Sequence, residues 1–146
     1  MEHDRMRALG RWALSALLVL AGVAHLTVQR VAFRAQVPPW FPGDPDVVVL
    51  VSGVVEVLLG VGLAVLGRRA RWAGVVVAAF FVAIFPGNVA QFVEHRDAFG
   101  LDTDVERFVR LWFQPVLVVW ALWSTGGWGW LRSALGGSDG RRAPGL

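Results

Sequence analysis

Four long apolar segments dominate this sequence of 146 residues and limit what it can fold into. They cover residues 12–28, 47–66, 72–93 and 108–125. A helix needs roughly 20 apolar residues to cross the hydrocarbon core of a bilayer, and each segment comes close to that length. Charged residues make up 17% of the chain, against about 25% in ordinary soluble domains. We therefore predict an integral membrane protein with four transmembrane helices.

The short connections between these segments predict their arrangement. Membrane helices joined by short loops pack as antiparallel neighbours in one bundle. The expected fold is accordingly all-α, with an antiparallel four-helix transmembrane domain over residues 12–125. Residues 1–11 are expected to be a cytoplasmic segment, and residues 126–146 an interfacial and disordered cytoplasmic tail.

The beginning of the chain allows a second interpretation. An apolar stretch followed by Gly22, Val23 and Ala24 loosely fits a cleavable signal peptide. The polar His25 directly after these residues favours a helix that is retained, because it can serve a buried site with residues of the other helices.

The distribution of arginine predicts the orientation, since the side with more basic residues in its short loops faces the cytoplasm. All fourteen basic residues are arginines, and nine fall on one side of the predicted bundle: Arg5, Arg7, Arg11, Arg68, Arg69, Arg71, Arg132, Arg141 and Arg142. Both termini are therefore expected in the cytoplasm. The arginines lie at helix ends and not along one exposed face, which argues against nucleic-acid binding.

Glu56 is the only formal charge between Val47 and Leu66. An ionised side chain at the centre of a bilayer costs about 3 kcal/mol unless it is paired or neutralised. Three solutions are open: protonation, pairing with His25, or hydrogen bonds from other polar side chains, namely Ser52, Asn88 and Gln114. With His25 as its partner, Glu56 could hold or pass a proton.

Each predicted helix places a polar side chain in the outer half of the bilayer. We predict one ligand-binding or proton site made by His25, Ser52, Glu56, Asn88, Gln91 and Gln114. Small residues follow these positions at helical spacing, so three stripes should face inward: Ala21, Gly22 and His25; Ser52, Glu56 and Gly60, with Gly53 beside them; and Ala79, Ala83, Gly87 and Gln91.

Two prolines and a proline-rich loop are expected to shape this pocket. Pro86 and Pro115 have no N–H and would free the carbonyls of Val82 and Leu111, so kinks there would open space. Gly53 would let helices approach closely. The loop VPPWFPGDPD is either a stiff connector or a cover that brings Trp40 and Phe41 over the pocket.

Other kinds of site find little support. The chain has no cysteine, which excludes disulfides and thiol chemistry of its own. His3, His25 and His95 are not grouped, so no metal site is expected. No catalytic residue is predicted. The simplest alternative is that the polar side chains only join helices through hydrogen bonds of about 1 kcal/mol.

Several motifs resemble those of the DoxX-like family of small bacterial membrane proteins. They are GVAH at Gly22–His25, VPPWFP at Val37–Pro42, SGVVE at Ser52–Glu56, FPGN at Phe85–Asn88, and Gln114 in the fourth helix. The similarity covers residues 10–125 and marks His25, Pro39, Trp40, Ser52, Gly53, Glu56, Pro86, Asn88 and Gln114. The family commonly reads FPAN where this chain has Gly87.

The resemblance implies a four-helix bundle in the bacterial cytoplasmic membrane. Some distant relatives are subunits of thiosulfate:quinone oxidoreductases or partners in membrane redox complexes. The leading hypothesis is therefore an accessory subunit that binds a quinone or lipid-like molecule near Glu56 and His25, in contact with the bilayer and with a redox enzyme subunit or a second copy of itself. A structural or assembly protein without a ligand is the alternative, and a small transporter is a third.

Overall fold

The computed structural model describes residues 1–136, apart from the side chain of Arg68, and these residues form helices joined by short loops. The helices are α1 (Glu2–Leu26), α2 (Arg30–Phe33), η1 (Arg34–Gln36), α3 (Pro45–Leu66), η2 (Gly67–Arg69), α4 (Ala70–Val93), α5 (Asp104–Leu111), α6 (Phe113–Thr125) and α7 (Gly127–Gly136). No β-strand occurs among residues 1–136, so the predicted all-α class is confirmed. The predicted disorder of residues 137–146 lies outside the described part of the chain.

Four helical stretches are long and apolar enough to cross a membrane: α1, α3, α4 and the consecutive pair α5–α6. Their number and composition confirm the predicted spans. The first helix begins at Glu2, ten residues before the predicted start at Trp12. Glu2 and Asp4 lie in its first turn, where acidic side chains interact favourably with the helix dipole.

Proline acts differently in the last two spans. Trp112 separates α5 from α6, and Pro115 explains the break because it has no N–H to bond the carbonyl of Leu111. In contrast, α4 continues through Pro86 without interruption. The side chain of Gln114 donates a hydrogen bond of 2.9 Å to the carbonyl of Phe81, beside the carbonyl of Val82 that Pro86 leaves without its helical donor.

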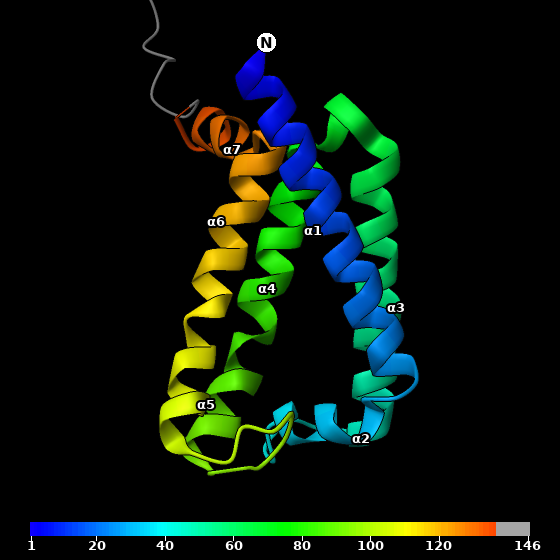
Figure 1. The fold of residues 1–146 in the computed structure, drawn as a ribbon, viewed down its shortest axis with the longest axis vertical. Coiled ribbons are helices and arrows are strands. Elements are labelled where there is room, and N and C mark those ends of the chain that lie inside the picture. Colours follow the sequence, from blue (N-terminus) through cyan, green and yellow to red (C-terminus); the bar gives the residue numbers. More distant parts are fainter. Residues whose placement is uncertain (137–146) are drawn as a thin grey trace, which may run out of the picture.

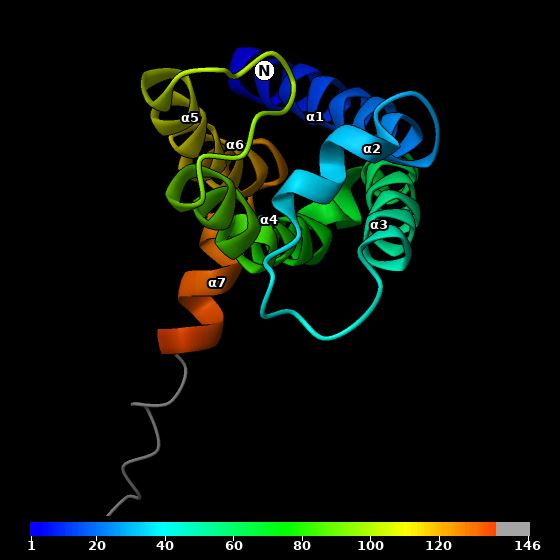
Figure 2. The ribbon, with the colours of Figure 1, turned by 90° about the horizontal axis from the view of Figure 1, so that it is seen from below.

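Figure 1 shows the N-terminus and α7 at one end of the structure, here called the α7 end, and α2 and α5 at the other, here called the α2 end. Along the bundle, α1 packs on α3 and on α6, and α4 packs on α6. Figure 2 looks onto the α2 end, where α2 and the connector after it cross between α1, α3 and α4. Contacts of η1 with α3 and α4 fix this crossing.

The interior and the surface are both apolar. The buried cluster joins all four long helical stretches and includes Leu14, Leu18, Leu63, Val77, Phe81 and Ala121. Many large apolar side chains along the middle of the same helices are exposed, among them Leu20, Val51, Leu58, Val82 and Val119. A surface of this kind suits contact with lipid, because water-soluble monomers expose only small apolar patches.

Glycine determines how closely α1 and α3 approach. A Cβ atom on Gly22 would lie 2.6 Å from the carbonyl oxygen of Gly53, and one on Gly53 would lie 2.8 Å from Cβ of His25. Further along the same contact, Ser15 donates a 2.6 Å hydrogen bond to the carbonyl of Gly60. The small-residue faces predicted for the first two spans therefore meet, as small residues permit in membrane helices.

The stripe predicted for the third span is wrong in part. Gly87 and Gln91 are buried and Ala83 lines an open cavity between the helices, but Ala79 is exposed. The face of α4 that carries Val77, Ala78 and Phe81 is buried instead. These residues bury more apolar surface than two alanines would, so they determine which side of α4 faces the core.

The close α1–α3 contact predicts different effects of alanine at two glycines of α3. Gly53→Ala should lower the free energy of unfolding by about 1 to 3 kcal/mol, because the added methyl group overpacks the contact. Gly62→Ala is the control, since a Cβ atom there meets nothing within 4 Å. Denaturant titration in detergent micelles, followed by circular dichroism, measures both. Equal stabilities of the two variants would contradict the packing described.

Candidate functional site

The buried acid Glu56 and the imidazole of His25 face each other across the contact of α1 with α3. Nδ1 of His25 lies 3.0 Å from Oε2 of Glu56. The two residues are 7% and 4% exposed. Of the partners expected for Glu56, His25 is the one that reaches it, and no hydrogen bond to Ser52, Asn88 or Gln114 is present among the described residues.

The position of one proton distinguishes two states of this pair. Nδ1 of His25 also lies 2.8 Å from the carbonyl oxygen of Ala21. If Nδ1 carries hydrogen and donates it to Ala21, Oε2 of Glu56 is buried without a hydrogen-bond donor among the described residues. If Nδ1 is bare, it can accept a hydrogen bond from protonated Glu56. The short Nδ1–Oε2 distance fits either state, so the geometry allows the pair to hold a proton.

An aromatic side chain from α2 fixes the imidazole ring. Phe33 stacks on His25 with ring centroids 3.3 Å apart and planes inclined by 16°. Phe99 packs edge-on against Phe33 at 4.7 Å, and the guanidinium of Arg110 lies 5.0 Å above the Phe99 ring. Three segments that are distant in sequence therefore support one face of His25.

Ion pairs hold α2 and η1 against the start of α3. Nε of Arg30 lies 3.1 Å from Oδ1 of Asp46, and Nε of Arg34 donates to the same oxygen at 2.7 Å. The carboxylate of Asp44 caps α3 by accepting from the backbone N–H of Asp46 at 2.7 Å, and Pro45 takes the first helical position, where its missing N–H costs nothing. This local chemistry places Phe33 over His25.

A cavity of about 270 Å³ opens beside the imidazole at the α2 end. Its wall comes from α1, α2, η1, the connector, α3 and α4: His25, Phe33, Gln36, Val37, Pro38, Trp40, Phe41, Val48, Val49, Ser52, Ala83, Ile84, Pro86 and Gly87. Three of these side chains, His25, Gln36 and Ser52, are polar. An apolar wall with a few polar groups is typical of small-molecule sites, although such sites usually enclose about 300–1,000 Å³.

The proline-rich connector covers this cavity. Trp40 and Phe41 line it while they remain 69% and 43% exposed. Arg96 anchors the connector, because its Nη1 donates a 2.9 Å hydrogen bond to the carbonyl of Val37. Glycine is needed at position 87, since a Cβ atom there would collide with the carbonyl oxygen of Gln36.

The remaining predicted residues form a second polar cluster, which meets the cavity wall at Gln36. Asn88 donates to Oε1 of Gln114 at 3.0 Å, and both side chains are buried between α4 and α6. Nε2 of Gln36 donates to Oε1 of Gln91 at 3.1 Å. When the oxygen and nitrogen of the Gln36 amide are exchanged, the oxygen accepts a hydrogen bond from Nη2 of Arg110, 2.8 Å away. Gln91 then has to donate to Gln36 and no longer accepts from it.

The structure therefore divides the predicted site in two. His25, Glu56 and Ser52 belong to the α1–α3 side, with Gly53 at the helix contact and Trp40 and Pro86 in the cavity wall. Asn88, Gln91 and Gln114 join helices, and Pro115 is exposed in a separate apolar groove with Val82 and Phe85. Among residues 1–136, no three His, Asp or Glu side chains come together as metal ligands would.

Sequence reasoning missed Phe33 and Gln36. Both lie in the loop expected after the first span, and the structure shows this loop as the short helices α2 and η1. Residues three or four apart lie on one face of a helix. The spacing of Phe33 with Gln36 and of Arg30 with Arg34 was therefore the available signal for a helical turn in this loop.

The second polar cluster predicts a loss of stability when Gln114 becomes leucine. Gln114→Leu removes the acceptor of buried Asn88 and the donor to Phe81, which should cost about 1 to 3 kcal/mol of unfolding free energy. Gln29→Leu is the matched control, because Gln29 is exposed and its side chain bonds to no other described residue. Denaturant titration in micelles measures both; a Gln114→Leu variant as stable as the control would contradict the assignment.

Comparison with known proteins gives one match. A family model described as a domain of unknown function (DUF8561) matches residues 14–125. The matched range contains the cavity wall and both polar clusters, and it excludes the first turns of α1 and the whole of α7. No curated protein and no solved structure matches the chain.

Proposed function

The chain belongs to the DUF8561 family, and we propose that it is a multi-pass membrane protein that binds an amphipathic ring compound of the quinone class in the cavity beside His25. The sequence resemblance to DoxX-like proteins supports this class of ligand. In the proposal the protein is an accessory subunit of a membrane redox complex in the bacterial cytoplasmic membrane, where it positions a carrier for a catalytic partner.

We further propose an antiparallel bundle with both termini in the cytoplasm. Arginines of the α7 end support this orientation, because Arg5, Arg7, Arg11, Arg69 and Arg71 lie near the ends of α1 and α4. At the α2 end, the described arginines are largely paired with acids, as Arg34 is with Asp46 and Arg107 is with Asp97 and Asp104. The cavity would then open toward the outer face of the membrane.

The observation that carries the proposal is the buried pair of His25 and Glu56 directly behind an apolar cavity. A quinone ring has carbonyl oxygens that accept hydrogen bonds and flat faces that pack on aromatic and aliphatic side chains. The imidazole of His25 lines the cavity and can donate to such an oxygen. The hydroxyl of Ser52 also lines it and bonds to no other described residue, so it is a second available donor.

The size of the cavity limits what fits. A volume of about 270 Å³ suits one ring headgroup and not the isoprenoid tail, because sites that enclose whole drug-sized molecules are larger. A tail would leave past Trp40 and Phe41, which are exposed at the wall. When bound, a quinone would supply the redox chemistry; this chain contributes orientation, exclusion of water and a proton held by His25 and Glu56.

Binding of the short-tailed analogue decylubiquinone to the purified protein in detergent tests this proposal. His25→Phe should weaken binding about tenfold, because it removes a hydrogen bond to the ring. Glu56 does not line the cavity and acts as a positioning residue for His25. Wild type should therefore show a ligand-induced infrared signal of a carboxyl group that Glu56→Gln lacks, in addition to any change in affinity.

Ser15→Ala provides the control. Ser15 bonds the carbonyl of Gly60 in the same α1–α3 contact but lies outside the cavity wall, so its removal should affect stability and leave affinity unchanged. Wild-type protein that binds no decylubiquinone, or a His25→Phe variant that binds as tightly as wild type, would contradict the proposal.

A structural protein without a ligand is the second candidate. The cluster of Asn88 and Gln114 favours it, because these buried amides are satisfied by each other and by the carbonyl of Phe81 and leave no group directed at the cavity. In that case, Glu56→Gln and His25→Phe would change the free energy of unfolding, and no variant would affect binding of any ring compound.

A further inference from the structure

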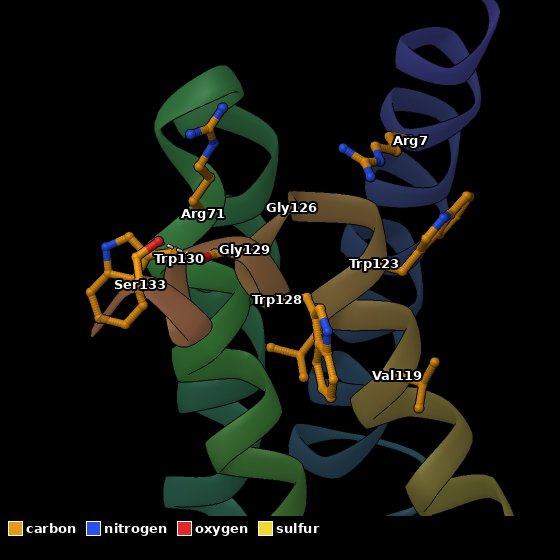
Figure 3. Close-up of a pocket in the computed structure, with 10 residues that line it drawn as sticks. Arg7, Arg71, Val119, Trp123, Gly126, Trp128, Gly129, Trp130 and Ser133 are labelled. Atoms are coloured by element: carbon orange, nitrogen blue, oxygen red, sulfur yellow. Dashed lines mark hydrogen bonds between the residues drawn. The ribbon is translucent and has the colours of Figure 1, made fainter. Parts of the chain in front are cut away.

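A larger cavity, of about 700 Å³, lies at the α7 end, away from His25 and Glu56. Figure 3 shows the residues around it: Arg7 from α1, Arg71 from α4, Val119 and Trp123 from α6, and Trp128, Trp130 and Ser133 from α7. A second cavity of about 620 Å³ adjoins it and shares Arg7, Arg71 and Gly126. Neither belongs to the site proposed above.

Two arginine side chains, those of Arg7 and Arg71, line this cavity. In Figure 3, Arg7 and Arg71 lie on either side of Gly126. A Cβ atom built on Gly126 would lie 4.0 Å from Nη1 of Arg7 and 3.9 Å from Nε of Arg71. Neither arginine makes an ion pair or hydrogen bond with another residue of the described chain. The described residues that form the wall of this cavity include no acidic side chain, so an anion bound there would interact favourably with both guanidinium groups.

The adjoining cavity adds further basic groups. Arg5 and Arg11 line it, with Asp4 as the only acid in its wall. Nη1 of Arg11 donates a 2.6 Å hydrogen bond to the carbonyl of Gly67, but its buried Nε has no partner. Within residues 1–136, this end of the bundle therefore carries more basic than acidic side chains around one opening.

The other wall of the larger cavity is apolar and aromatic. Val119 and Leu122 line it from α6, toward the middle of the bundle. Trp123, Trp128 and Trp130 are each about half exposed, at 44%, 50% and 45%. Tryptophan prefers the headgroup level of a bilayer, so these side chains place the cavity at the boundary between lipid chains and water.

We propose that this cavity binds the phosphate group of an anionic phospholipid, with Arg7 and Arg71 holding the phosphate and an acyl chain lying along Val119, Leu122 and Trp123. Guanidinium groups match the geometry of phosphate oxygens and donate two hydrogen bonds at once. The apolar wall favours a lipid over a free phosphate ion, which has nothing to bury there. Anionic lipids are also abundant in the leaflet to which arginine-rich ends face.

Part of this site lies outside the residues that the family model matches. Arg7 and all of α7 lie outside residues 14–125. A bound lipid would join α1, α4, α6 and α7 through one headgroup, and would hold α7 against the membrane surface. The inference does not depend on the function proposed for the cavity at the α2 end.

Titration of the delipidated full chain with dioleoylphosphatidylglycerol or dioleoylphosphatidylcholine in detergent tests the proposal, with bound lipid counted by mass spectrometry of the intact protein. Wild type should bind phosphatidylglycerol at least about tenfold more tightly than phosphatidylcholine. Arg71→Gln should remove most of this preference, whereas Arg71→Lys should retain part of it. Arg69→Gln is the matched control, because Arg69 carries the same charge at the same end but lies outside both cavity walls.

Inorganic phosphate and glycerol 3-phosphate form the competition arm. Neither should displace phosphatidylglycerol at concentrations near its apparent Kd, because they cannot fill the apolar wall. Displacement at such concentrations would assign the site to a soluble phosphate and overturn the lipid proposal. Equal binding of both lipids by wild type, or equal loss of affinity in Arg71→Gln and Arg69→Gln, would also overturn it, and the wild-type comparison holds even if a variant fails to fold.

Discussion

The contact of α1 with α3 at their glycines is the interaction on which the rest of the structure depends. Gly22 and Gly53 bring the two backbones so close that no β-carbon fits between them. His25, one turn beyond Gly22, is thereby pressed against the face of α3 that carries Glu56. Two ionisable side chains in a membrane helix contact are tolerable when they lie next to each other and lipid is kept away, and the glycines provide this exclusion.

The cavity needs a second constraint, which comes from segments outside the long helices. Asp46 accepts from Arg30 and Arg34 and so fixes α2, while Arg96 holds the connector from the side of α4. Phe33 then covers one face of the imidazole, and Gln36 reaches Gln91. The wall of the cavity therefore depends on charge pairs at the membrane boundary, where water screening is weaker than in bulk and pairs of good geometry can order a loop.

The sequence alone predicts the parts of this arrangement that follow from length and periodicity. The four spans follow from apolar length. Depth and the neighbouring small residues make His25 one of the possible partners of Glu56, but they do not choose it over Ser52, Asn88 or Gln114. The rotation of α4 could not be predicted in full, because this helix is apolar on nearly every side and offers little angular information. Ala79 was expected to face inward for this reason, and it is exposed.

The hydrogen-bond partners of the buried amide side chains could not be predicted from the sequence either. Asn88 and Gln114 are at the same depth as Glu56, but depth does not say which neighbour a side chain faces, and they bond to each other instead. The helices α2 and η1 are too short to be stable alone. They exist because Phe33, Arg34 and Gln36 find partners in other segments, and such contacts appear only when the chain is folded.

The burial pattern also bears on whether the bundle could hold a ligand at one end or conduct it across the membrane. The His25–Glu56 pair adjoins the cavity at the α2 end, but toward the α7 end the same helix contact is filled by Leu14, Leu18 and Leu63, which are 0%, 2% and 0% exposed. No polar side chain other than Ser15 interrupts this stretch on the buried face of α1, and Ser15 is satisfied by Gly60. A proton or ligand that reaches His25 is thus in contact with one side of the bundle only. Transport through a single copy would require these leucines to separate, at the cost of the packing that brings α1 and α3 together, so the geometry favours a site that binds and holds over a path that conducts.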